Sequence, residues 1–89
     1  MLVLTPQAAA MIDRLATEAE LPHGGGLRIA RQGRRSLAMA LAPAPEPADA
    51  VVRDRDVAVF LDPPAARRLA DQVLDARTDE RGSAFFLGR

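Results

Sequence analysis

The 89-residue chain contains no cysteine. Without a thiol it can form no disulfide, no thiolate metal site and no bound cluster of the usual kind, and it has no cysteine nucleophile. It also lacks tryptophan, tyrosine and lysine, and has three phenylalanines. Every one of its basic residues is therefore arginine, whose flat guanidinium favours bidentate contacts with carboxylates and phosphates.

Long apolar runs and a surplus of either charge are missing as well. No stretch approaches the roughly 20 apolar residues of a membrane span, and Met1–Leu4 is too short for the core of a signal peptide. Twelve acidic residues balance twelve basic ones, so the chain has no general electrostatic attraction to nucleic acid or to an anionic membrane. We expect a cytoplasmic protein without either partner.

Alanine supplies a large share of the apolar residues. Burying an alanine removes little apolar area from water, and the gain is only about 25 cal/mol per Å². The core is therefore expected to be thin for a single domain covering residues 1–89, and formation of a homo-oligomer is a reasonable way to bury more surface.

The first element indicated is a helix. Thr5 supplies a capping oxygen and Pro6 suits the first helical position. Apolar residues then recur at helical spacing, and Pro22 with the glycines at 24–26 stops the pattern. The members of this stripe are Ala8, Ile12, Leu15 and Ala19.

The next segments alternate with a period of two, which is typical of strands. Residues 27–30 and 37–42 show this alternation on either side of a polar link, Arg31 to Ser36, and together they predict a hairpin. Three prolines then indicate an extended connector, because proline cannot pair within a sheet. These prolines are Pro43, Pro45 and Pro47.

The second half predicts further short elements. Val51-Val52 and Val57–Leu61 indicate strands, and Asp62-Pro63-Pro64 indicates the start of a helix that contains Ala65, Ala66, Leu69 and Ala70. Residues 73–78 could continue that helix or form a strand. A turn at Asp79–Gly82 and a last strand at Ala84–Leu87 follow. The fold class predicted is α+β, with an N-terminal helix, a second short helix and several short antiparallel strands.

The densest group of charges lies in and around the predicted hairpin. Converging guanidiniums there could hold a phosphate or a carboxylate-bearing partner, or they could be the solvated charges that discourage edge-to-edge association. No aromatic residues interleave with them to stack bases, which argues against nucleic acid. These candidate contact residues are Arg28, Arg31, Arg34 and Arg35.

No other group of residues indicates a reaction or a bound cofactor. His23 is the only histidine and has no metal-ligating neighbour in the sequence. Nearly every carboxylate has an arginine within a few residues, a pattern typical of weak surface pairing rather than acid–base catalysis. We therefore expect neither an enzyme nor a catalytic, cofactor-binding or metal-binding residue.

The order of four short motifs resembles the A-type iron–sulfur carriers, also called HesB-like proteins. The motifs are an opening "LT-x-x-A" pattern, a first hairpin strand, a "V-x-V-F-L-D-P" run and a closing "L-D … G-F" pattern. They span almost the whole chain, at Leu4–Ala9, Gly26–Ala30, Val57–Pro63 and Leu74 to Phe86. The resemblance implies the compact HesB-like fold, and it favours a strand over residues 73–78.

The same resemblance implies a function that this chain lacks the ligands to perform. Such carriers hold iron or a cluster with one cysteine in the first hairpin and a Cys-Gly-Cys near the C-terminus, typically across a dimer. Here the hairpin position falls near Arg34 or Arg35, and the Cys-Gly-Cys would begin at about Arg89. Two hypotheses follow. Either the domain is a non-catalytic relative that binds an unidentified protein partner, or it carries iron or a small ligand through oxygen and nitrogen groups.

Overall fold

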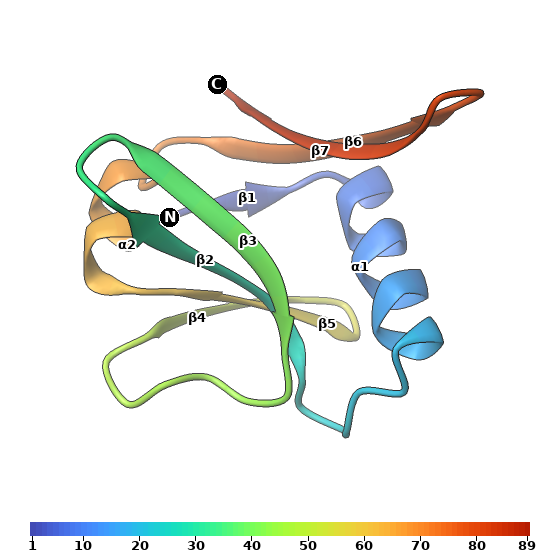
Figure 1. Cartoon of the computed structure of the whole chain (residues 1–89), viewed down its shortest axis with the longest axis horizontal. Coiled ribbons are helices and arrows are strands. Elements are labelled where there is room, and N and C mark those ends of the chain that lie inside the picture. Colours follow the sequence, from blue (N-terminus) through green and yellow to red (C-terminus); the bar gives the residue numbers. More distant parts are fainter.

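The computed structural model describes all residues, 1–89, and contains two helices and seven strands in two sheets. Figure 1 shows the two sheets facing each other, with the first helix along one side. The elements follow the chain as β1 (Val3–Leu4), α1 (Pro6–Glu18), β2 (Gly26–Gln32), β3 (Ser36–Ala42), β4 (Ala50–Asp54), β5 (Val57–Leu61), α2 (Pro63–Arg68), β6 (Val73–Asp79) and β7 (Gly82–Gly88).

The N-terminal helix begins as its sequence predicts. The Thr5 hydroxyl accepts a hydrogen bond from the Ala8 N–H at 3.1 Å, and Pro6 is the first helical residue. The same hydroxyl donates to Asp75 on β6 at 2.6 Å, which lowers the pKa of that carboxyl because the bond favours its charged form. The cap therefore fixes the helix against the sheet that contains β6.

The four-stranded sheet has the order β3-β2-β5-β4. The predicted hairpin is confirmed as the antiparallel pair β2–β3, whose link shortens to residues 33–35 because both strands extend to Gln32 and Ser36. Strand β5 lies between β2 and β4, and all five of its residues are buried. A central strand covered on both faces is apolar throughout, which explains the uninterrupted run Val57–Leu61.

The three-stranded sheet has the order β1-β6-β7. Residues 73–78 form a strand that pairs with β7 in antiparallel register across a turn at Glu80–Arg81, as predicted. Helix α2 is shorter than expected: Asp62 caps it through the Ala65 N–H, but it ends at Arg68 and leaves Ala70 outside. Two pairings, β1–β6 and β2–β5, are parallel, whereas the sequence predicted antiparallel strands.

One core of 16 buried residues joins the inner faces of both sheets to α1. It contains no polar side chain, and alanines make up several of its members, as the composition predicts. Its largest fully buried members are Ile12, Ile29, Leu74 and Val59, while Phe60 is buried outside this cluster. Neither helix has the length and the apolar character that a membrane crossing requires.

Candidate interaction surface

The β2–β3 hairpin ends in a tight three-residue link that exposes two arginines. Gly33 has a positive φ of 70°, a backbone conformation that residues with a side chain rarely adopt. Arg34 and Arg35 follow it directly, and both are exposed. The hairpin therefore presents two adjacent guanidiniums at its tip.

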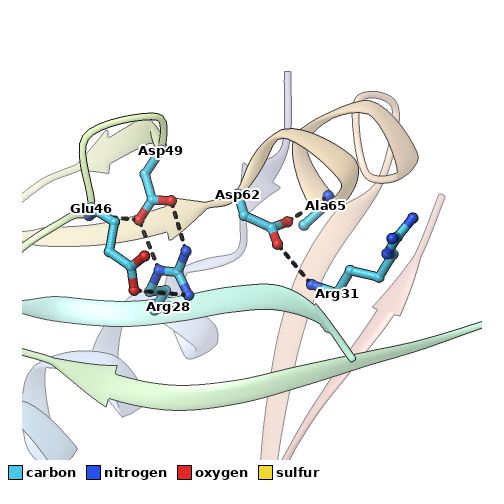
Figure 2. A network of polar contacts seen from close by, with 6 residues as sticks. All are labelled: Arg28, Arg31, Glu46, Asp49, Asp62 and Ala65. Atoms are coloured by element: carbon cyan, nitrogen blue, oxygen red, sulfur yellow. Dashed lines mark hydrogen bonds and ion pairs between the residues drawn. The ribbon is translucent and has the colours of Figure 1, made fainter. Parts of the chain in front are cut away.

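Arg31 lies at the same end of the hairpin, and its backbone is fixed to the start of α2. The Arg31 N–H donates to Asp62 at 3.0 Å, while the other oxygen of this carboxylate accepts from Ala65 at 2.9 Å. Figure 2 shows the Arg31 side chain extending away from this contact. Because only the backbone is engaged, the guanidinium of Arg31 stays exposed.

Helix α2 brings another arginine, Arg68, to the hairpin tip. A guanidinium nitrogen of Arg68 donates to the backbone carbonyl of Arg35 at 2.8 Å, and Arg67 precedes it in the last turn. This pair was not among the candidates from the sequence, because residues 67–68 lie 32 or more positions away from the hairpin link. A second Arg-Arg dipeptide in an otherwise evenly charged chain was the only available signal.

These five exposed arginines form what we call the basic end: Arg31, Arg34, Arg35, Arg67 and Arg68. None of them takes part in an ion pair in the structure. Apart from the capping Asp62, neither residues 31–37 nor helix α2 contains an acidic residue. Although the whole chain is neutral, this end of the molecule carries five arginines against Asp62 and Asp71, the latter just after α2.

Arg28, the fourth candidate from the sequence, lies apart from the basic end. Its guanidinium makes two parallel bonds to Asp49, at 2.8 and 2.9 Å, and approaches Glu46 at 3.4 Å. Figure 2 shows both carboxylates above Arg28. The hydrogen bonds from Arg28 lower the pKa of Asp49, whose side chain is only 1% exposed. Arg28 therefore holds the proline-rich connector against β2.

The basic end is not hollowed. Every hollow in the surface is lined by residues elsewhere, as in the groove between α1 and β6 and the depression beside His23. No three His, Asp or Glu side chains gather in a metal-binding arrangement. The arginines thus present an open surface, which suits another macromolecule better than an enclosed small ligand.

The iron or iron–sulfur cluster that the resemblance to the A-type carriers implies does not fit this hairpin. Cluster ligation needs thiolates, with histidine as an occasional substitute. The link and the first residue of β3 offer two guanidiniums and a serine hydroxyl, and the only histidine lies in the loop before β2. Guanidiniums donate hydrogen bonds and accept none, so they cannot ligate a metal.

Compared by sequence, the chain matches no family model and no curated relative. Compared by structure, it resembles IscA with a [2Fe-2S] cluster, at 25% identity and a TM-score of 0.79 over 100% of this chain and 85% of that one. It also resembles SufA from Escherichia coli, which is involved in the biosynthesis of iron–sulfur clusters, at 22% identity and a TM-score of 0.81 over 99% and 84%. A protein from Aquifex aeolicus, solved by NMR, matches at 22% identity and a TM-score of 0.70 over 97% and 88%. The resemblance to the A-type carriers and the α+β fold are confirmed.

Proposed function

We propose that this chain is a non-catalytic protein-binding module and that its basic end contacts an acidic surface of its partner. The chain contains no cysteine but shares its fold with IscA and SufA. One observation carries the proposal. The hairpin where the resemblance implies a thiol presents instead two arginines, and Arg68 of α2 contacts the second of them.

The chemistry of the basic end favours a carboxylate-bearing protein. Its five guanidiniums have no acidic partner within the chain, so an incoming carboxylate replaces water and no internal ion pair has to break. Arginine is enriched at interfaces because its planar fork binds carboxylates bidentately. No aromatic side chain lies in the hairpin link or in α2 to stack a base. Nothing in the structure favours the alternative hypothesis of an iron or small-ligand carrier.

The first prediction is that these 89 residues form no stable iron–sulfur cluster. Anaerobic incubation with ferrous iron, sulfide and a reductant, followed by gel filtration, should return a colourless protein, because no thiolate is available to hold the iron. IscA treated in parallel is the positive control, since its structure holds a [2Fe-2S] cluster. A brown protein that retains iron and sulfide in equal amounts would contradict the prediction.

The second prediction tests the basic end itself. The variant Arg34→Glu/Arg35→Glu should bind the partner about ten times more weakly than the wild type, within the usual range for interface anchors. Both side chains are exposed and make no bond in the structure, so the melting temperature should stay within about 2 °C. The partner is first captured from the native host and identified by mass spectrometry, and the affinity of the purified pair is then measured by calorimetry.

A matched control separates position from net charge. The variant Arg77→Glu/Arg81→Glu makes the same change of charge on the β6–β7 hairpin, where both arginines are exposed. Its affinity should remain close to that of the wild type. Equal losses in both variants would show that overall charge alone governs binding, and no loss in either would place the contact surface elsewhere.

A further inference from the structure

Strand β3 forms an unprotected edge of the four-stranded sheet. It pairs only with β2, so its other side carries unpaired backbone groups over all of Ser36–Ala42. Natural edge strands are usually blunted by charged residues, prolines or bulges. Strand β3 has none of these, whereas the opposite edge, β4, carries Arg53 and Asp54.

The apolar side chains of β3 are incompletely covered. Leu37 and Leu41 are partly buried, and Met39 between them is 36% exposed although it pairs with the fully buried Ile29. These three residues share one face of the strand, because side chains alternate along it. Two alanines, Ala38 and Ala40, occupy the other face. The edge is thus uncharged on both faces and apolar on the inner one.

The sequence of this edge reads the same in both directions. Residues 37–41 are Leu-Ala-Met-Ala-Leu, with Met39 at the centre. If two copies lie antiparallel about a two-fold axis at Met39, Met39 faces its own copy, and each Leu37 faces the other copy's Leu41. Directly opposed residues in an antiparallel pair point to the same side of the sheet. Each apolar residue of Leu37–Leu41 therefore meets an apolar one, and only the outermost pair, Ser36 with Ala42, is mixed.

We propose that two copies of this chain pair through β3 in this register and form one continuous eight-stranded sheet from two four-stranded ones. The pairing supplies about one backbone hydrogen bond per residue of the edge and covers more of the exposed Met39 and of the partly buried Leu37 and Leu41. A second copy is the occupant that the palindrome specifies, because a two-fold interface must be complementary to itself. Since the strands run antiparallel, the two basic ends lie far apart and stay free. The inference does not depend on the proposed function.

Analytical ultracentrifugation over a range of concentrations tests the pairing. The wild type should sediment as a dimer, and Met39→Lys should raise the dimer dissociation constant at least about tenfold, because two ammonium groups then meet at the axis. The matched control is Val51→Lys, on the other edge of the same sheet at 39% exposure. It should dimerise like the wild type, and circular dichroism checks that both variants are folded.

Engineered cysteines test the register, since the chain has none of its own. Directly opposed residues in antiparallel strands have Cα atoms about 4.5–5.5 Å apart, a separation that a disulfide spans. Met39→Cys should therefore oxidise to a covalent dimer. Leu37→Cys alone should not, but should do so when mixed with Leu41→Cys.

Three outcomes would overturn the inference. One is a wild type that stays monomeric at every concentration tested. Another is a dimer that Met39→Lys leaves as stable as Val51→Lys does. The third is a Leu37→Cys variant that cross-links to itself as readily as Met39→Cys, because this would indicate another register or another interface.

Discussion

Replacing Gly26 with alanine should destabilise the protein by about 3 kcal/mol and lower its melting temperature by about 15 °C. Gly26 is buried at the start of β2, where the backbone of β5 passes very close to it. A Cβ atom there would lie 2.2 Å from the carbonyl oxygen of Ala58 and 2.9 Å from its carbonyl carbon. Because backbone atoms cannot rotate away, the two central strands of the four-stranded sheet must separate.

The control for this prediction is Gly88→Ala. Gly88 lies at the end of β7, where a Cβ would meet nothing within 4 Å. Neither glycine has a positive φ, so the two substitutions differ in the available space and not in backbone strain. Gly88→Ala should change the stability by no more than about 0.5 kcal/mol. If thermal unfolding gave similar melting temperatures for the two variants, β2 and β5 would not approach as closely as described.

The close approach at Gly26 illustrates what the sequence could not predict. The triple glycine at 24–26 indicated only a turn after a helix, whereas its last residue is needed for contact with Ala58, 32 positions away. The parallel pairings β1–β6 and β2–β5 were likewise not predicted from the sequence. Each depends on where distant segments meet in the folded chain, and a single sequence carries no local signal for this.

Local signals predicted their elements well. Thr5 and Asp62 each cap a helix through a side-chain oxygen, and both were assigned from the residue type and the proline that follows. The period of two in residues 27–30 and 37–42 indicated the correct hairpin. The end of α2 was placed too late, because the alanines and leucine at 65–70 continue the helical pattern beyond the point where the chain turns toward β6.

The candidate site also combines features that local sequence patterns predict with features that depend on tertiary contacts. Arg34 and Arg35 lie in a turn, so their exposure followed from the local pattern. The contribution of α2 to the basic end arises from one tertiary contact, between Arg68 and the Arg35 carbonyl. The involvement of Arg28 in holding the connector arises from another, with Asp49 at 21 residues' distance. Charge spacing alone does not show which arginines are already paired.

The contact between Arg28 and Asp49 holds a proline-rich connector that would otherwise have few attachments. Arg28 alternates with the core residues Leu27 and Ile29, so it meets Asp49 on the face of the four-stranded sheet opposite to the main core. Phe60, which neighbours Arg28 in register on β5, is fully buried on that face. Asp49 also accepts the backbone N–H of Glu46 at 2.9 Å. The carboxylate thus closes a turn in the connector and fixes it above β2.

Asp49→Asn should therefore lower the free energy of unfolding by about 2 kcal/mol, because charge-assisted hydrogen bonds are lost while the guanidinium of Arg28 remains partly covered. The control is Asp54→Asn, whose partner Arg55 lies 3.1 Å away on the surface, and which should cost at most about 1 kcal/mol. Urea unfolding of the two variants and the wild type at pH 7 measures both changes.

The dependence of this difference on pH identifies its cause. Arg28 lowers the pKa of Asp49 in the folded state, so the carboxylate's contribution is fully present above its unfolded pKa of about 3.9. That contribution is lost as the pH falls through the lower pKa of Asp49 in the folded state, because Asp49 is then protonated in both the folded and the unfolded chain. The gap in stability between the wild type and Asp49→Asn should narrow below about pH 4. If the gap stayed constant down to pH 2, the variant would be destabilised by altered packing of the connector, and the ion pair with Arg28 would not be what holds it.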